Sequence, residues 1–574
     1  MKLDVLFMNL HRRYLNLSAK VGGFLGIHYL SAYLLANGYE AKGYSGTLKD
    51  GKLILDELCA NNDIKMLGLY SDYDNVTENI YISRYVKENY HIPVIIGGPQ
   101  ADALNVDFYE KSQCDTVVIG EGELTVYELT KFFIDGMGTL ENILGIRYLN
   151  NSKIIHNPSR PLIESLDDLP FITENCYLEP AYFYNQLNIM TGRGCPFHCA
   201  FCHEGIGKSV RFRSVENILA EIDEYLEKYD GDELRIFFTD DTFTLNAERV
   251  KAICEGLRLR NQNHCSIRFF CEGHVHTLYK NPEMLKYLAD GGCYRLQLGI
   301  EAGTDEILKI YGKNSTTKEI LEVTRLACDL GLRQIVGNII VGGAFFNQDI
   351  FEADKKFVKE LLNVGKGVVE IGVVTFWPLP NTPMTKNPEK FGIKICDDEF
   401  LTSLGEFPQA ETCDLDRLDI AEKQHELENF IDNEMKSLLK SKKIPTSVVL
   451  DWFCQANINY SGAWFALLGQ MERLFAFYEM IYLGEGTESK DLTDFEDARP
   501  MRVEYLYRCL TKVSKDTVLI DGEEFTGKDL EIVTLTTGKL SVKEIAERVS
   551  LSVSAVKKVL DRLENMGLIV YTLY

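Results

Sequence analysis

Short apolar runs alternate with amphipathic helical patterns over residues 1–150, and this alternation restricts the fold more than any other feature of the sequence. Helical patterns at Phe24–Asn37 and Val76–Asn89 separate some of these runs. Alternation of this kind predicts a doubly wound, Rossmann-like α/β domain with a parallel sheet. Glycines follow the last two runs, at the sheet edge where such folds bind ligands. The expected strands are Leu3–Met8, Ala41–Tyr44, Met66–Tyr70, Val94–Ile96 and Thr116–Ile119.

A second alternating region, residues 186–400, follows a linker at 151–185 that contains four prolines. Helical patterns such as Val215–Tyr229 and Lys318–Leu330 lie between its apolar runs. Six strand–helix units in succession predict a partial (β/α)6 barrel of the TIM type, with its active site at the carboxyl ends of the strands. The expected strands are Leu187–Thr191, Leu234–Thr239, Ile267–Cys271, Arg295–Ile300, Gln334–Val341 and Gly372–Trp377.

The remainder of the chain has a different pattern. Residues 401–495 are rich in helical and aromatic stretches. Within 496–574, the segments Leu540–Val549 and Ser552–Met566 predict two helices, and Leu568–Tyr574 predicts an extended wing. This order indicates a C-terminal winged helix.

Composition excludes several classes of protein. The 574 residues carry 61 basic and 85 acidic side chains, a net charge of −24, so nucleic acid is an unlikely partner. The sequence has no run of 18 apolar residues and no signal-peptide pattern, which predicts a cytoplasmic protein without membrane association. Fifteen cysteines without an export signal are expected to be mostly reduced thiols.

Three cysteines directly after the first strand of the second region are the strongest chemical signal. Cys195, Cys199 and Cys202 have the spacing C-x3-C-x2-C. Thiolates are soft ligands that bind iron–sulfur clusters or zinc. Three thiolates on a four-iron cluster would leave one iron open for another ligand. The alternative is a zinc site completed by His198 or His203.

This motif resembles the cluster motif of the radical SAM superfamily, in which an aromatic residue, here Phe201, precedes the last cysteine. The resemblance implies a [4Fe–4S] cluster held by the three cysteines, with S-adenosylmethionine (SAM) chelating the open iron. It implies that an electron, from a donor such as flavodoxin or ferredoxin, cleaves SAM to a 5′-deoxyadenosyl radical.

Later segments resemble the SAM-binding motifs of the family in the same order. Thr239, Asp240 and Asp241 resemble the segment that binds the SAM amino group, although the two aspartates could instead cap the next helix. Glu301 resembles the acidic ribose ligand, with a helix N-terminal charge partner as its alternative. Asn338 resembles part of the adenine-flanking strand, and Trp377 is either pocket wall or core. Glu272, after the third barrel strand, and Asp241 are the candidate catalytic residues.

The N-terminal domain resembles the cobalamin-binding domain of cobalamin-dependent radical SAM enzymes. Its signature here is two glycine motifs, Gly97-Gly98-Pro99 and Gly120-Glu121-Gly122-Glu123, with Ser71 at the end of a neighbouring strand. The resemblance implies corrin contacts from Ser71, Gly97, Gly98, Pro99, Glu121 and Gly122. The D-x-H-x-x-G motif that supplies a histidine to cobalt is absent. A retained fold with an empty or repurposed pocket is therefore the alternative.

The winged helix has three possible uses. The stretch Val518–Phe525 and the helices after it resemble the winged-helix domains that bind leader segments of ribosomally made peptides as an added strand. Its second helix could instead bind nucleic acid, or the domain could be a structural cap.

Together these features predict a radical SAM enzyme that removes hydrogen from an unactivated carbon, with cobalamin-dependent methylation of a ribosomal peptide. Cyclisation, desaturation or epimerisation without methyl transfer is the alternative. A redox-sensing, DNA-binding regulator is a third hypothesis, which the SAM-type segments disfavour.

Overall fold

The computed structural model describes residues 3–11, 25–61, 64–72, 75–180, 187–203, 207–231, 233–263, 265–396, 408–441, 443–444, 448, 499–502, 510–514, 517–520, 523–536, 540–566 and 569–572. The chain forms two compact units. The first consists of residues 1–365 and 369–430, and the second of residues 366–368 and 431–574.

The first unit begins with a seven-stranded sheet in the order β2-β1-β3-β4-β5-β6-β7. Strands β1 to β5 are parallel, which confirms the doubly wound fold, whereas β6 and β7 add an antiparallel edge that the sequence did not predict. Because β7 lies at Lys153–His156, the sheet extends into the segment expected to be linker. The strands are β1 (Val5–His11), β2 (Ala41–Thr47), β3 (Met66–Tyr70), β4 (Val94–Gly97), β5 (Thr116–Val118), β6 (Ile146–Asn150) and β7.

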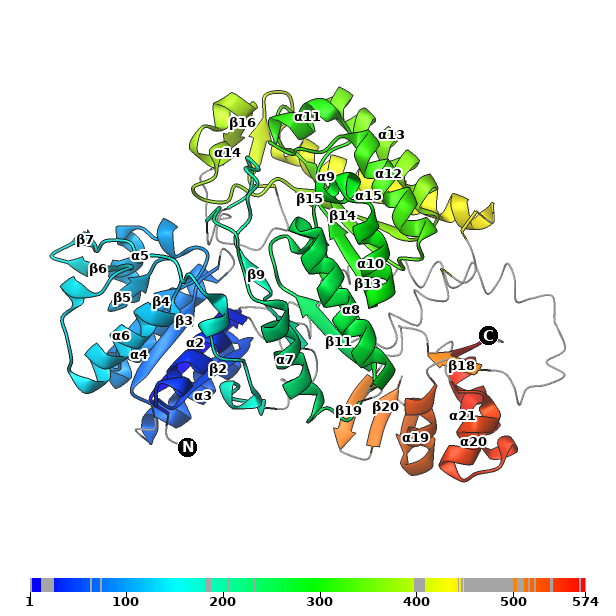
Figure 1. Ribbon diagram of the computed structural model, residues 1–574, viewed down its shortest axis with the longest axis horizontal. Helices are drawn as coiled ribbons and strands as arrows, with labels where there is room; N and C mark the ends of the chain where they lie inside the picture. The colour runs from blue at the N-terminus through cyan, green and yellow to red at the C-terminus, as the bar shows by residue number, and fades with distance from the viewer. Residues whose placement is uncertain are drawn as a thin grey trace. The chain divides into compact units, whose positions relative to one another are not determined.

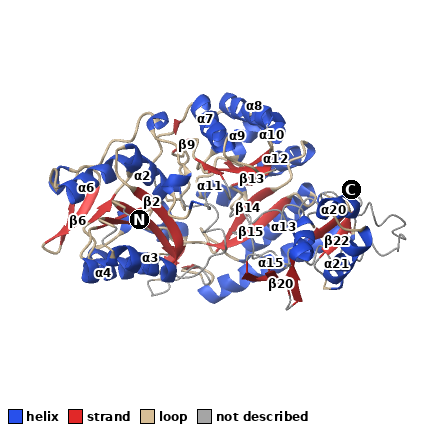
Figure 2. Ribbon diagram, turned by 90° about the horizontal axis from the view of Figure 1, so that it is seen from below, coloured by secondary structure: helices blue, strands red, loops and turns tan. Residues whose placement is uncertain are grey.

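Helices cover both faces of this sheet, and Figure 2 shows α2 and α6 on one side and α3 and α4 on the other. Each side has its own apolar core. Helix α3 was not predicted; it begins after Thr47, whose side chain accepts a hydrogen bond from the Asp50 amide. The helices are α2 (Leu25–Ala36), α3 (Leu48–Ala60), α4 (Val76–Tyr90), α5 (Val106–Ser112) and α6 (Glu123–Asp135).

The second part of this unit is a six-stranded parallel sheet in the order β15-β14-β13-β12-β11-β8 (Figure 1). Its order and direction confirm the partial barrel, because every strand pairs with its predecessor in parallel. The strands are β8 (Leu187–Ile189), β11 (Glu233–Phe238), β12 (Ser266–Gly273), β13 (Cys293–Leu298), β14 (Ile335–Val341) and β15 (Val369–Thr375). The main helices between and after them are α7 (Val215–Leu226), α8 (Ala247–Asn263), α9 (Val275–Lys280), α10 (Glu283–Gly291), α11 (Asp305–Ile310), α12 (Thr317–Asp329) and α13 (Gln348–Gly365).

The end of the chain contains the expected winged helix. A three-stranded antiparallel sheet, β19-β20-β21, is followed by helices α19, α20 and α21, and β22 pairs with β18. Apolar residues of these helices form a separate core. The predicted helical region 401–495 contains α15 (Arg417–Lys440), and most of its remainder lies outside the described residues. The bounds are β18 (Arg499–Arg502), β19 (Leu510–Ser514), β20 (Thr517–Ile520), β21 (Glu523–Thr526), α19 (Gly527–Leu535), α20 (Val542–Val549), α21 (Val553–Asn565) and β22 (Ile569–Thr572).

Among the helices of the described residues, none has both the length and the apolar composition needed to cross a membrane.

Candidate functional site

The three-cysteine loop follows β8 at the carboxyl mouth of the barrel and is anchored by backbone contacts. Gly194, just before the first cysteine, has φ +91, and a Cβ there would lie 2.5 Å from the Ser209 carbonyl oxygen. This position therefore requires glycine. The Ala200 amide donates to the Tyr311 carbonyl at 2.8 Å, and the Met384 amide donates to the Ala200 carbonyl at 3.1 Å. The loop is thus fixed from two later segments of the barrel.

The three thiols differ in exposure, and two of them lie near the Lys313 ammonium. Cys195 and Cys199 are half-buried and Cys202 is exposed. Burial raises the pKa of Cys199, while the nearby Lys313 ammonium acts in the opposite direction on the thiols of Cys199 and Cys202. Three thiols from one loop, with a cation beside them, suit a cluster that leaves one iron open.

His203, one of the two histidines of the zinc alternative, makes a contact of its own with Asp102. Within the part of the chain that the structure describes, no group of three or more His, Cys, Asp or Glu side chains is placed to hold a single metal ion. His203 lies with Nε2 3.4 Å from Asp102 Oδ1 rather than among the thiols.

Asp240 holds the cysteine loop rather than facing the site. Its carboxylate is buried and accepts hydrogen bonds from the amides of Thr191, at 2.6 Å, and Gly192, at 3.1 Å, and from the Thr191 hydroxyl. Arg249 lies 4.0 Å away and donates to the Thr191 carbonyl. Both carboxylate oxygens are engaged, so Asp240 fixes the backbone at Thr191 and Gly192, and its contact with the SAM amino group stays a prediction. Asp241 is the exposed acidic residue of the pair.

Glu301 follows β13 in a left-handed conformation, φ +62, which is uncommon for a residue with a side chain. Its amide donates to the Asn338 carbonyl at 2.7 Å, so β14 fixes its backbone. Its carboxylate accepts from Lys313 Nζ at 3.0 Å, and both side chains are largely buried. A Cβ at Gly299 would lie 2.2 Å from the same Nζ. Lys313, which the sequence did not single out, therefore links Glu301 with the cysteines.

Glu272 lies beneath this group on β12. It pairs in register with Gln297 of β13, whose amide nitrogen donates to its carboxylate at 3.1 Å. Burial, reinforced by the negative charges of Asp241 and Glu301, raises the pKa of Glu272 to about 7. A carboxyl group titrating near neutrality in the barrel can hold or accept a proton at physiological pH.

The other predicted SAM contacts lie around the same mouth. Phe201 packs edge-on against Tyr311, with ring centroids 5.2 Å apart. Thr239 is exposed at the end of β11, and its amide donates to the Ile189 carbonyl. Trp377 is half-buried in the segment after β15. Asn338 is half-buried on β14. A Cβ at Gly372 would lie 2.3 Å from its Oδ1 atom.

His274 is a second residue that sequence reasoning missed. Its ring stacks on Phe197 of the cysteine loop, with centroids 3.6 Å apart, and burial lowers its pKa to about 3. Neither ring nitrogen has a hydrogen-bond partner among the described residues. The available signal was its place after a barrel strand, in the segment Cys271-Glu272-Gly273-His274.

The carboxyl edge of the first sheet carries buried polar groups without partners. Gly98, at φ +130, packs so closely on Ser71 that a Cβ would lie 2.5 Å from the Ser71 carbonyl oxygen, while Gly97 and Pro99 flank it. Within the described residues, atoms of four side chains at this edge lack hydrogen bonds: Asn9 Nδ2, Ser45 Oγ, Ser71 Oγ and Gln100 Nε2. Since buried polar groups are normally paired, this edge suits a ligand rich in hydrogen-bonding groups, as corrin amides are.

Glu121, in the second glycine motif, makes three contacts outside its own domain. It forms ion pairs with Arg193 at 2.7 Å and Arg211 at 3.0 Å, and it accepts a hydrogen bond from the Ile163 amide at 2.7 Å. These contacts join Glu121 to the barrel, and its expected corrin contact stays a prediction. The next residue, Gly122, precedes α6, and a Cβ there would lie 3.0 Å from Leu30.

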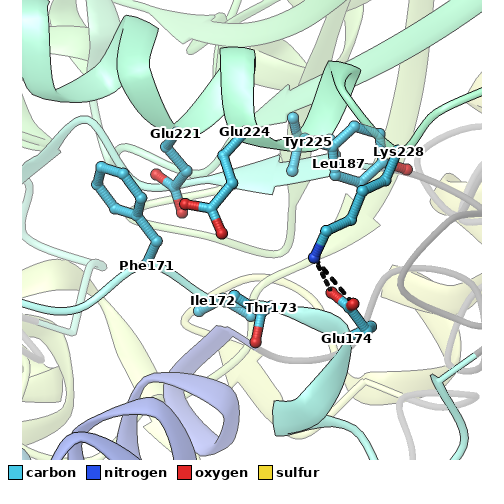
Figure 3. Close-up of a pocket in the computed structure, with 9 residues that line it drawn as sticks. All are labelled: Phe171, Ile172, Thr173, Glu174, Leu187, Glu221, Glu224, Tyr225 and Lys228. Atoms are coloured by element: carbon cyan, nitrogen blue, oxygen red, sulfur yellow. Dashed lines mark hydrogen bonds and ion pairs between the residues drawn. The ribbon is translucent and has the colours of Figure 1, made fainter.

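A small cavity lies away from this mouth, between α7 and the segment Phe171–Glu174 (Figure 3). It encloses about 10 Å³, space for a single water. Leu187, the first residue of β8, is among its lining residues, so the cavity is at the amino end of that strand. It is separate from the cysteine loop.

A six-stranded parallel barrel with three cysteines after its first strand defines a radical SAM enzyme. In agreement, the family model described as the Radical SAM superfamily matches residues 189–358. The chain is 30% identical over 345 residues to an uncharacterised methyltransferase of Pyrococcus horikoshii, covering 59% of this chain and 73% of the relative. The chain therefore belongs to the radical SAM superfamily.

Two solved structures are similar in fold. The radical S-adenosylmethionine methyltransferase TsrM from Kitasatospora setae, with cobalamin and a [4Fe–4S] cluster bound, matches with a TM-score of 0.60 and 16% identity. That match covers 76% of this chain and 89% of TsrM. The cobalamin-dependent radical enzyme OxsB matches with a TM-score of 0.60 and 18% identity, covering 98% of this chain and 84% of OxsB. Residues 534–570 match a family model described as winged helix-turn-helix DNA-binding.

Proposed function

We propose that this enzyme transfers a methyl group to an unactivated carbon, using cobalamin together with the cluster and SAM. The observation that carries the proposal is the row of unpaired buried polar groups along the carboxyl edge of the first sheet, in a chain that belongs to the radical SAM superfamily. The fold likeness to two cobalamin-containing enzymes supports it.

Cys195, Cys199 and Cys202 would hold the cluster. A bound [4Fe–4S] cluster would supply the electron that cleaves SAM, and bound methylcobalamin would be the source of the methyl group. A one-electron reductant, such as flavodoxin or ferredoxin, would be needed. We assign Glu301 to the sugar hydroxyls of SAM, and the hydrogen bond from Lys313 that orients its carboxylate supports this assignment.

In the first domain, Ser71 and the glycine turn at Gly98 would face the corrin. The histidine motif that places an imidazole on cobalt is absent from the sequence. His28 is buried against Tyr177, with ring centroids 3.7 Å apart, and its pKa is lowered to about 4 by burial. It is a core residue, so the cobalt would be bound without a protein imidazole from this position.

Glu272 and Gln297 form a polar pair inside the barrel. With its pKa near 7, Glu272 can donate a hydrogen bond when neutral and accept one when ionised. We assign this pair to the substrate, since it lies on strands whose carboxyl ends open to the cysteine loop.

We propose a ribosomally made peptide as substrate. Support comes from the order of elements in the second unit, where a three-stranded antiparallel sheet precedes three helices. Among the residues that the structure describes in this unit, strand β21 pairs only with β20, so its other edge can accept an extended leader as a further strand.

The side chains of the winged helix favour peptide over DNA. Arg562, one of the basic residues of α21, is ion-paired with Glu523 and Asp529, at 3.1 and 3.0 Å. It also lies over the Phe525 ring, 4.3 Å from the centroid. A cation engaged in this way contributes little to phosphate binding.

The test begins with anaerobic reconstitution of the full-length protein. We expect about four irons, a corrin absorption band, and reductive cleavage of SAM to 5′-deoxyadenosine. Loss of the iron and of SAM cleavage in the Cys195→Ala variant, with the corrin band retained, would assign the cluster to this loop. Reconstituted protein without corrin binding would contradict the cobalamin proposal.

The substrate is tested with a candidate precursor peptide and the same peptide lacking its leader. A mass gain of about 14 Da, only with the leader, supports methylation of a leader-guided peptide. A loss of two hydrogens would instead indicate cyclisation or desaturation. Retention of duplex DNA with a steep salt dependence would overturn the peptide assignment of the winged helix.

A further inference from the structure

Both ends of the three-cysteine loop contact the N-terminal domain. At the first end, Arg193 lies two residues before Cys195 and forms ion pairs with Glu121 at 2.7 Å and Glu123 at 2.5 Å. All three side chains are buried, with exposed fractions of 8%, 4% and 4%. Arg211, from the strand that pairs with Gly192–Arg193, also reaches Glu121.

At the other end, His203 immediately follows Cys202. Its Nε2 lies 3.4 Å from Asp102 Oδ1, and its side chain is buried. The second oxygen of Asp102 accepts a hydrogen bond from Asn381, in the segment after β15, at 2.9 Å. Asp102 therefore joins the end of the cysteine loop to the last barrel strand.

The residues of the N-terminal domain that contact Arg193 and His203 lie in or just after its two glycine motifs. Glu121 and Glu123 belong to Gly120-Glu121-Gly122-Glu123 after β5, and Asp102 follows Gly97-Gly98-Pro99 after β4. Both motifs lie at the carboxyl edge of the first sheet, the same edge that carries the unpaired polar groups. One surface of the N-terminal domain thus holds the cysteine loop at both ends.

The energetics favour a fixed arrangement. A buried arginine and buried glutamates are costly without their partners, because desolvated charges need a counter-charge. If the two domains separated, Arg193 would lose its carboxylate partners, and Glu121 would lose its arginine partners from the barrel. Hinge motion at this interface is therefore opposed by the ion pairs.

We propose that Arg193 is a positioning residue, and that its ion pairs with Glu121 and Glu123 set the position of the cysteine loop relative to the N-terminal domain. The glutamates of this glycine motif then serve the domain interface and not a cofactor. The further consequence, that the same ion pairs fix the distance between cluster and corrin, rests on the proposed function.

Hydrogen exchange of the full-length, cofactor-free protein tests the interface directly. Arg193→Met and Glu123→Gln should each accelerate exchange about tenfold or more in two segments, 191–203 of the barrel and 97–103 of the N-terminal domain. The matched control is Glu221→Gln. Glu221 is equally buried and pairs with Arg213 at 2.6 Å, but both residues belong to the barrel.

The control variant should accelerate exchange around α7 and leave 97–103 unchanged. Unchanged exchange of 97–103 in both Arg193→Met and Glu123→Gln would overturn the proposal. Should Arg193→Met fail to fold, the milder Glu123→Gln variant still decides the question. It removes one ion pair, and glutamine has nearly the same shape as glutamate.

A spectroscopic measurement separates this inference from the proposed function. In reconstituted protein, the magnetic interaction between the reduced cluster and cob(II)alamin should weaken or broaden in Glu123→Gln and stay unchanged in Glu221→Gln. Protein that binds iron without corrin contradicts the cobalamin proposal, while the exchange result still decides the role of Arg193. Identical interaction spectra in wild type and Glu123→Gln would overturn the distance-setting role.

Discussion

Gly194 combines two demands that only glycine meets, a positive φ and no room for a Cβ. Gly207, further along the same connection, has a similar φ of +85 but open space around it. The pair therefore separates the cost of the backbone conformation from the cost of the steric clash.

We predict that Gly194→Ala lowers iron content after reconstitution several-fold, whereas Gly207→Ala retains it. The left-handed conformation alone costs about 1 kcal/mol, which the second variant tolerates. In the first variant the Ser209 carbonyl must also move, and the cysteines with it. Iron and sulfide analysis of the two proteins measures the difference. Equal iron content would show that the loop adapts to the added methyl group.

Glu272 makes a pH-dependent contribution to stability. Its pKa is raised from the ordinary value of 4.5 to about 7, so the folded protein binds a proton that the unfolded chain releases between these values. The stabilising contribution of the protonated form is complete below pH 4.5 and is lost as pH rises through 7. The total change is about 3 kcal/mol at most.

We predict that Glu272→Gln gains stability relative to wild type as pH rises from 5 to 8, because glutamine has no proton to release. Thermal unfolding of the cofactor-free proteins at both pH values gives the comparison. Glu306→Gln, at an exposed position of α11, is the control and should show no such trend. A constant difference between wild type and Glu272→Gln would contradict the raised pKa.

The site residues differ in how far sequence could predict them. The cysteines could be recognised because their spacing within one loop carries the chemistry. Asp240 and Glu121 could not, because their partners, Thr191, Arg193 and Arg211, come from other segments. The sequence shows that a carboxylate follows a strand. Which distant arginine or amide donates to that carboxylate depends on the fold.

At the level of elements, the parallel strands were predictable because each is a short, buried apolar run bounded by turns. The antiparallel edge formed by β6 and β7 was missed, since the paired residues of β7 are exposed or half-buried and lack such a run. Helix α3 was missed because its first five residues include two lysines, an aspartate and a glycine, which weaken the apolar pattern.

The contacts of helix α21 give an element-scale prediction. Arg562 ties α21 to β21 and α19 through Glu523 and Asp529, both partly exposed. We predict that Arg562→Ala destabilises this domain by about 1 kcal/mol, as expected for half-exposed ion pairs. It should accelerate hydrogen exchange in 523–535 without changing retention on duplex DNA. A loss of DNA retention in Arg562→Ala would instead indicate a phosphate contact.

At the scale of the whole molecule, the two cofactor sites are built from different parts of the chain. The cysteines, Glu301 and Lys313 belong to the barrel, and the unpaired polar edge belongs to the first sheet. Contacts such as Arg193 with Glu121 join these parts, and Arg193 is not among the residues expected to hold the cluster. Assembly of one site is therefore not chemically required for assembly of the other.

This separation predicts independent loading of iron and corrin. The triple variant with alanine at 195, 199 and 202 should lose iron and SAM cleavage while retaining a corrin band, because its first sheet is unchanged. Protein prepared without cobalamin should keep its iron and still cleave SAM to 5′-deoxyadenosine, yet transfer no methyl group. Iron analysis, visible spectra and chromatography of SAM products give the three readouts. Loss of corrin in the triple variant would show that the cysteine loop itself completes the corrin site, since the two domains meet at that loop.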